Sequence, residues 1–240
     1  MIHTDELYYT RTGRVMLREC DMYRRLKPMA VLELFQECTE GLTENWDVGL
    51  DKMLDNGLIW VAARVGATVH RLPVHNELIT VKGWSVRSRA GIFPYRYRIT
   101  APDGELLIEG SSMWVLSDLQ AHSMLSGNVP VLHLPSPEGE KSPMPKLAAI
   151  RPEKEFNTSS RRVLYSECDI NGHFTNNRYM DWLSDLADAD FHHSHPMTGL
   201  RIDYRAECFP YEEIPLEWKV TDERIWCRSP RRFDAMIQFG

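Results

Sequence analysis

The strongest constraint on this chain is that it repeats itself. The tripeptide Glu-Cys-Asp occurs at residues 19–21 and again at residues 167–169, an offset of 148 (169 − 21). Each copy is followed at a similar distance by an apolar pattern with helix spacing, and then by several strand patterns. A second short match aligns residues 70–73 with residues 207–210, an offset of 137 (207 − 70). The shared order predicts an internal duplication, with two like units in one chain.

The first unit has the pattern of a strand, a helix and four further strands. The first strand is expected within residues 6–19. Pro28 suits a first helical turn, and an apolar face at helix spacing runs from Val31 to Trp46. Residues 48–54 favour a second short helix. Alternating patterns then predict strands over residues 59–71, 78–88, 93–100 and 105–117.

A proline-rich stretch separates the two units. Residues 126–155 contain six prolines, and such a segment cannot pair into a sheet. We therefore expect an N-terminal domain over residues 1–125, a linker over residues 126–155 and a C-terminal domain over residues 156–240. In the last of these the patterns predict a strand over residues 162–168 and a helix over 177–189. Further strands are expected over residues 200–206, 215–221, 225–228 and 233–239.

One long helix followed by four strands, with a strand before it, is typical of an antiparallel sheet curled around a central helix. This is the hotdog architecture. The sequence predicts an α+β fold of two tandem hotdog units joined by the Pro-rich linker. Their helices would be buried and their sheets would join edge to edge, which removes exposed strand edges.

Composition narrows the class of protein. The 240 residues are 43% hydrophobic and 26% charged, as in ordinary globular proteins, and no apolar run is long enough to span a membrane. The net charge of −6 argues against general nucleic-acid binding. The five cysteines form no C-x-x-C pair, and the N-terminal residues resemble neither a signal nor a transit peptide. A cytoplasmic protein is expected.

Polar residues gather where the second Glu-Cys-Asp meets the following helix. Asp169, Asn171 and His173 alternate, so an extended backbone would turn all three to one side. Asn176 is a plausible N-cap of the helix. An acceptor, an amide and an imidazole side by side suggest a reaction site.

These residues carry a family resemblance. Residues 169–179 resemble the D-x-N-x-H-x-x-N-x-x-Y signature of acyl-acyl-carrier-protein thioesterases, and residues 204–208 resemble the later Y-R-x-E-C motif of that family. The likeness extends over the whole chain, with the linker between two units and the site in the second. It implies hydrolysis of an acyl-acyl carrier protein, with release of a free fatty acid. The partner would be an acyl carrier protein with an acyl-phosphopantetheine arm.

Thioester hydrolysis needs a polarised carbonyl, a water and a group that takes the proton of the water. Glu207 is the best candidate base, and partial enclosure by Phe209, Trp182 and Tyr204 would raise its pKa. Asn171 can hold the water or the thioester oxygen. His173 can protonate the leaving thiolate or orient Glu207, and Asp169 can fix the loop. Each residue also has a plainer interpretation, as a turn former, a surface acid or a loop histidine without function.

Cysteine and histidine raise two alternatives. Cys208 could pair with His173 as a nucleophile, but in a strand it would face away from its neighbour Glu207, and packing is the better interpretation. His192, His193 and His195 lack a carboxylate or cysteine at a metal-site interval, so we expect no metal. Without a nucleotide motif, no cofactor is expected either.

The first unit lacks this chemistry. The offsets of 148 and 137 give the residues of the first unit that align with Asp169, Asn171, His173 and Glu207. They are Asp21, Tyr23, Arg25 and His70. No base or positioning amide remains, so we expect this unit to receive the acyl chain, with Phe35, Trp60 and Ala63 among the lining residues. Core packing is the alternative for each.

An acidic chain that binds an acidic carrier protein needs a local basic patch. We expect Arg178 to contact the substrate, and the other candidates are Arg161, Arg162, Arg228, Arg231 and Arg232. Two other functions stay open, namely an acyl-CoA thioesterase and a non-catalytic acyl-binding hotdog protein. A homodimer is one assembly that the sequence allows.

Overall fold

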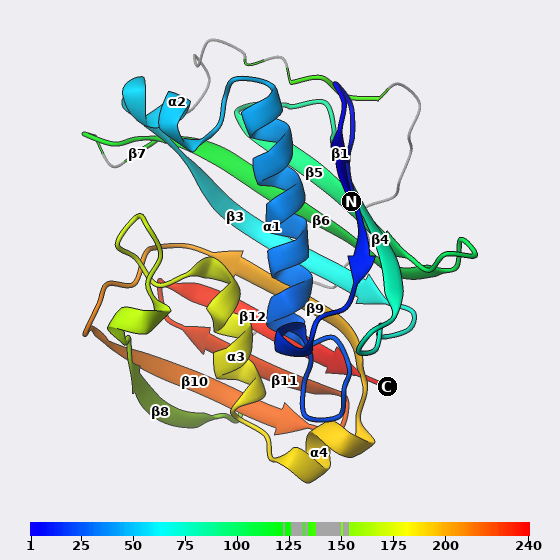
Figure 1. Ribbon diagram of the computed structural model, residues 1–240. Coiled ribbons are helices and arrows are strands. Elements are labelled where there is room, and N and C mark those ends of the chain that lie inside the picture. The colour runs from blue at the N-terminus through cyan, green and yellow to red at the C-terminus, as the bar shows by residue number, and fades with distance from the viewer. Residues whose placement is uncertain (122, 126–131, 133, 138–149, 151–153) are drawn as a thin grey trace.

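The computed structural model describes residues 1–121, 123–125, 132, 134–137, 150 and 154–240. Most of the expected linker, residues 126–155, lies outside this part of the chain. The described strands form one large antiparallel sheet, and α1 and α3 lie against the same side of it (Figure 1). The strands are β1 (Ile2–Thr4), β2 (Tyr9–Arg14), β3 (Leu58–Val69), β4 (Leu78–Ser85), β5 (Ile92–Thr100), β6 (Leu106–Asp118), β7 (Ser123–Met124), β8 (Asn157–Arg162), β9 (Met197–Tyr204), β10 (Glu213–Thr221), β11 (Arg224–Ser229) and β12 (Phe233–Phe239). The helices are α1 (Pro28–Asn45), α2 (Leu50–Asp55), α3 (Tyr179–Ser184) and α4 (Ala189–Ser194), with 3-10 turns η1 (Leu17–Glu19), η2 (Tyr165–Glu167) and η3 (Asn176–Arg178).

The strand order is mirrored about the middle of the sheet. It runs β1-β2-β4-β5-β6-β3 in the first half and β9-β12-β11-β10-β8 in the second. The two parts meet edge to edge, as predicted, where β3 pairs with β9 from Arg64↔Asp203 to Thr68↔Gly199. Over the paired residues, the two inner strands are therefore joined instead of exposing free edges.

The predicted long helix is present as α1. Pro28 is its first residue, and Val31, Phe35 and Cys38 lie on its buried face. The helix approaches the sheet closely because the facing strands carry glycine. A Cβ on Gly110 would lie 2.1 Å from the Phe35 ring, and one on Gly83 would lie 2.5 Å from the Cβ of Cys38. Phe35 stacks on Tyr97 with ring centroids 4.4 Å apart.

The helical region of the second half differs from the prediction. A single helix over residues 177–189 is wrong, because α3 ends at Ser184 and a new helix, α4, begins at Ala189. The side chain of Asp188 caps α4 by accepting the N–H of Phe191 at 2.8 Å. Asn176 is not an N-cap, since it lies within η3 and makes no capping bond.

The strand expected within residues 6–19 is partly wrong, because β2 ends at Arg14 and the 3-10 turn η1 follows. The strand expected over residues 162–168 is wrong except at Arg162, where β8 ends, and the 3-10 turn η2 follows it. A buried carboxylate makes the turn. Glu19 accepts the N–H of Met16 at 2.7 Å, and Glu167 accepts the N–H of Leu164 at 2.8 Å. The other eight predicted strands are confirmed to within a few residues at each end. None of the helices in the described residues has the length and apolar character needed to cross a membrane.

Candidate active site

The expected site loop is a tight turn between Cys168 and Phe174, which form an isolated antiparallel bridge. The N–H of Asp169 donates to the carbonyl of His173 at 2.9 Å, and the Asp169 carboxylate accepts the N–H of Asn171 at 2.9 Å. Gly172 has a φ of +77°, which favours glycine. The expected extended backbone is therefore wrong, and Asp169 is indeed a turn former. The turn still presents Asp169, Asn171 and His173 to one cavity.

Glu207 reaches the turn from a neighbouring loop. The chain leaves the sheet after Tyr204, and the carbonyl of Cys208 accepts the N–H of Phe174 at 2.8 Å. This bond fixes the loop against the turn. The Nδ1 of His173 lies 3.5 Å from the Oε1 of Glu207, within ion-pair distance. The Phe209 ring meets the imidazole edge to face at 5.0 Å and holds its orientation.

The expected cover of Glu207 by Trp182 is wrong. Its side chain is 46% exposed, whereas that of His173 is 26% exposed. Trp182, which was expected to cover Glu207, instead donates its indole N–H to the buried Glu167 at 3.2 Å. A carboxylate that reaches solvent in this way can contact the water whose proton it would accept.

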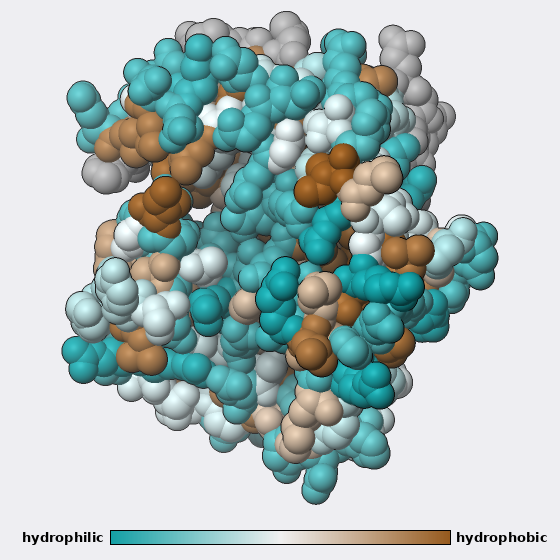
Figure 2. Space-filling view, viewed as in Figure 1, coloured by the Kyte–Doolittle hydropathy of each residue, from teal (hydrophilic) through white to brown (hydrophobic). Residues whose placement is uncertain are grey.

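Two cavities meet at this turn, and Figure 2 shows the surface hollowed beside α1, between α2 and the turn. One cavity, of about 370 Å³, has His173 and Glu207 in its wall, and we call it the Glu207 cavity. The other, of about 430 Å³, runs along α1, and we call it the α1 cavity. Four residues line both: Trp60, Asp169, Asn171 and Asn176. A group that spans the two cavities must pass these side chains.

The expected substrate-binding residues fall into two groups. Trp60 lines both cavities, with its indole N–H donating to the carbonyl of Val48 at 2.8 Å, and Ala63 lines the Glu207 cavity. Phe35 is buried in the core and borders only a space of about 10 Å³. Arg178 borders neither cavity, and its guanidinium lies 3.9 Å from Asp181. For Phe35 the plainer interpretation, core packing, describes its position.

Asn176 was predicted only as a helix cap, but it lines both cavities of the site. Its carbonyl accepts the hydroxyl of Tyr204 at 2.9 Å, and the adjacent Asn177 donates to Gln36 of α1 at 2.8 Å. The 3-10 turn is thus tied to both halves of the protein. Asn176 and Asn171 place two amides at the junction of the cavities. The sequence signal for this role was the second asparagine of the D-x-N-x-H-x-x-N-x-x-Y motif, which is Asn176.

Cys208 has the environment of a packed residue. It is 1% exposed, and its sulfur accepts the hydroxyl of Tyr179 at 3.3 Å. Burial raises the pKa of the Cys208 thiol, so that the reactive thiolate is disfavoured. It does not line the Glu207 cavity. The geometry therefore favours water over this thiol as the nucleophile.

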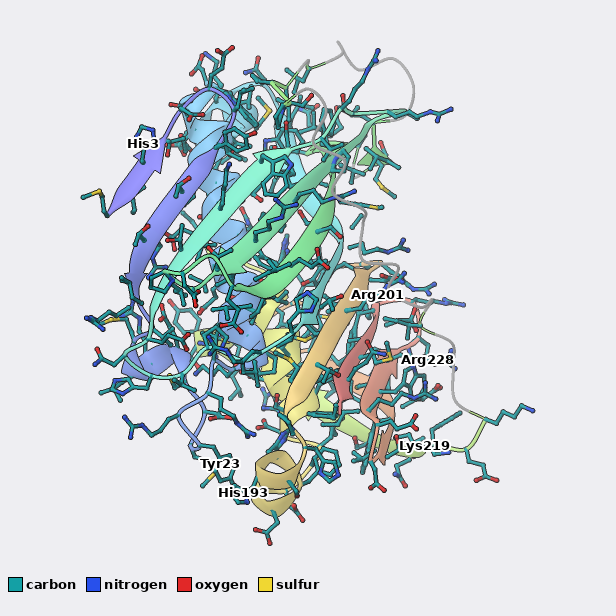
Figure 3. The ribbon with its side chains drawn as sticks, turned by 90° about the vertical axis from the view of Figure 1, so that its right-hand side faces the viewer. His3, Tyr23, His193, Arg201, Lys219 and Arg228 are labelled. Carbon is teal, nitrogen blue, oxygen red and sulfur yellow. The ribbon has the colours of Figure 1, made fainter. Side chains whose placement is uncertain are left out.

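The turn at residues 20–26 repeats the backbone of the site turn. The N–H of Asp21 donates to the carbonyl of Arg25 at 2.8 Å, and its carboxylate accepts the N–H of Tyr23 at 2.9 Å. Arg24, with a φ of +66°, stands where the site turn has Gly172. Here the side chains face α4. The hydroxyl of Tyr23 donates to the carbonyl of Ala189 at 2.6 Å, and Figure 3 shows Tyr23 beside His193.

His70, the residue of the first half expected to align with Glu207, lies two residues from the position that is equivalent in the structure. The carbonyl of Pro73 accepts the N–H of Leu26, as that of Cys208 accepts the N–H of Phe174, which gives an offset of 135 (208 − 73). Leu72, not His70, therefore stands at the position of Glu207. The similar prolines in the two segments, Pro73 and Pro210, are not equivalent. The first half still offers neither a base nor a positioning amide at this place.

Both halves of the chain are similar to known acyl-ACP thioesterase domains. The family model for the acyl-ACP thioesterase N-terminal domain matches residues 6–126, and the model for the C-terminal domain matches residues 150–234. This chain belongs to the acyl-ACP thioesterase family. Within the family, a dodecanoyl-[acyl-carrier-protein] hydrolase of Cinnamomum camphora is 23% identical over 84% of this chain and 56% of its own length. A palmitoyl-acyl carrier protein thioesterase of Gossypium hirsutum is 24% identical over 65% of this chain and 40% of its own. The chain thus spans about half the length of these curated relatives.

Solved acyl-ACP thioesterases share the fold over nearly the whole chain. An acyl-ACP thioesterase from Bacteroides thetaiotaomicron gives a TM-score of 0.79 at 17% identity, covering 97% of this chain and 98% of its own. The 12:0-ACP thioesterase of Umbellularia californica gives 0.77 at 18% identity, covering 99% of both chains. At such identities the likeness establishes the fold.

The candidate metal site and the expected basic patch can also be checked against the structure. No group of three or more His, Cys, Asp or Glu in the described residues could hold a metal ion. Of the expected basic patch, Arg161 pairs with Asp185 at 2.8 Å and Arg228 with Glu217 at 2.6 Å. Arg232 pairs with Glu212. Much of that positive charge is therefore balanced locally.

Proposed function

We propose that this chain hydrolyses the thioester of an acyl-acyl carrier protein and releases a free fatty acid. The observation that carries the proposal is the Glu207–His173 pair, which opens on a cavity that Asn171 and Asp169 also line. Membership of the acyl-ACP thioesterase family supports the same reaction. A non-catalytic acyl-binding protein would need none of these four side chains.

The chemistry follows from the placement of the groups. The thioester carbonyl lies at the junction of the two cavities, where the amide of Asn171 donates to its oxygen or holds the water. Glu207 takes a proton as the water oxygen bonds to the carbonyl carbon. The C–S bond then breaks, and the thiolate receives a proton through His173. The products are a carboxylic acid and a free thiol, so one water is consumed in each cycle.

Of the two cavities at the site turn, the α1 cavity suits the acyl chain better. From the carbonyl it extends past Trp60 into the α1 cavity, because Glu207 and His173 occupy the far wall of the other cavity. We propose that the first half receives the acyl chain in this way, and that the domains extend over residues 1–125 and 156–240. Because Ala63 lines only the Glu207 cavity of the two, enlarging it should hinder the approach to Glu207 equally for every acyl chain.

The finer architecture is also a proposal. The chain is organised as two tandem hotdog units, supported by the mirrored strand order and by the two matching turns. A reducing, cytoplasmic setting is supported by the cysteines, since all five are free.

A thiol-trapping dye assay tests the function directly. Acyl-acyl carrier protein, acyl-CoA and acyl-pantetheine with the same acyl chain are offered to the purified protein. The proposal predicts the highest kcat/KM for the carrier-protein substrate. Higher turnover of acyl-CoA would indicate an acyl-CoA thioesterase, and no release of thiol from any of the three would exclude hydrolysis.

A further inference from the structure

Strand β3 has a partner along its whole length on one side only. It pairs with β6 from Leu58↔Asp118 to Val69↔Ile108. On the other side it pairs with β9 only from Arg64 to Thr68, because β9 ends at Tyr204. Among the described residues, no strand pairs with this side of residues 58–63, which we call the β3 edge. Figure 1 shows β3 and β9 diverging toward the site turn.

The β3 edge forms a wall of the Glu207 cavity. Five consecutive residues, 59–63, border this cavity. Side chains of a strand alternate between its faces, so a cavity that contacts every residue in turn must follow the main chain at the edge. Arg205, Ala206 and Glu207 line the same cavity. The space lies where β9 would continue if it stayed in the sheet.

The point where the strands separate is firmly fixed. Arg64 donates to both carboxylate oxygens of its cross-strand partner Asp203, at 2.7 and 3.1 Å. The Arg201 guanidinium donates to the same carboxylate. A register shift between Ala62 and Arg64 bends β3 at this place, and such irregularities are common beside active sites. The slot is therefore closed at Arg64 and opens toward Leu58.

We propose that the β3 edge binds the phosphopantetheine arm of the substrate as an added strand. This inference rests on the proposed function, which delivers a thioester to Glu207. The arm is an extended chain with two amide groups, and the edge offers main-chain N–H and C=O groups that no described strand pairs on this side. An arm paired along residues 58–63 places its sulfur at the closed end, beside Glu207 and Asn171. The acyl chain then continues past Trp60 into the α1 cavity.

Hydrogen exchange tests the site without depending on turnover. The probe is an acyl-pantetheine thioether, which keeps both amides and cannot be hydrolysed. Amide exchange is measured in the wild-type protein with and without this probe. We expect slower exchange within residues 58–63. Residues 64–68 serve as the internal control, because β9 already pairs with them, and their exchange should not change.

Substrate analogues give the matching kinetic test. Replacing either amide of the arm by an ester removes one N–H donor and leaves the chain length unchanged. Each replacement should lower kcat/KM roughly threefold to tenfold, the effect of one hydrogen bond. Full turnover of both ester analogues, together with unchanged exchange over residues 58–63, would overturn the proposal. If no acyl thioester is hydrolysed, the proposed function fails. The exchange experiment then still decides on the edge, since protection by the thioether supports it and no protection overturns it.

Discussion

The turns at residues 20–26 and 168–174 share one backbone and differ in what their side chains do. Both are held by an aspartate that accepts an N–H two residues later, and both are preceded by a glutamate that makes a 3-10 turn. In the first turn, the side chains of Tyr23 and Arg25 donate to carbonyls of α4. In the second, Asn171 and His173 face a cavity. We call the shared backbone of the two turns the frame. The frame serves the fold, and the chemistry depends on which side chains of the turn face a cavity.

The largest expected effect is at the residue that the first half lacks. Glu207→Gln should lower kcat on acyl-acyl carrier protein by roughly two to four orders of magnitude, because an amide cannot accept the proton of water. The melting temperature should not change, since the side chain is 46% exposed. The matched control is Leu72→Ala at the equivalent position, which should keep kcat. Near wild-type turnover by Glu207→Gln would show that another group is the base.

A matched pair of aspartates separates the frame from the chemistry. Asp21→Asn and Asp169→Asn each keep an oxygen that can accept the N–H in the turn, so both proteins should fold. Only Asp169→Asn should lose activity, up to about a hundredfold, because its carboxylate lines the cavity and positions its neighbours. Steady-state kinetics of both variants provide the test. Equal losses would mean that the carboxylates serve only the fold.

The two glutamates test whether the frames are equivalent. Glu19→Ala and Glu167→Ala each leave a backbone N–H without its acceptor, so each should lower the free energy of unfolding by about 1–3 kcal/mol. Urea denaturation measures both. A large loss in one variant and none in the other would show that only one turn depends on its glutamate.

The smallest effect is expected at Cys208. Cys208→Ala should keep most of the activity, and at pH 8 the native thiol should react slowly with iodoacetamide, because burial raises its pKa. The rate of alkylation should rise with pH as more thiolate forms. Loss of all activity in a folded Cys208→Ala protein would support a covalent mechanism instead.

Sequence patterns predicted the long helix, most strands and the gathering of polar residues. Hydrophobic periodicity depends on neighbouring residues, and the repeated tripeptide can be found by direct comparison of the two segments. Aligning Pro73 with Pro210 placed His70 at the position of Glu207. In the structure, the equivalent residues are Pro73 and Cys208, because their main-chain carbonyls accept equivalent hydrogen bonds. Any residue can supply a carbonyl, so the sequence does not reveal this equivalence. The 3-10 turns were missed because their cause is a buried glutamate bonding three residues back. The position of Phe35 in the core depends on how closely α1 approaches Gly110, which no motif records.

The central claim is that Glu207 and His173 act as one unit on the bound thioester. A double-mutant cycle in single-turnover assays tests it, with Glu207→Gln, His173→Ala and the combined variant on acyl-acyl carrier protein. Residues that act together are strongly non-additive. The combined variant should therefore lose little more than the poorer single variant. Losses that simply multiply would contradict the account, because the two side chains would then contribute independently despite lying 3.5 Å apart.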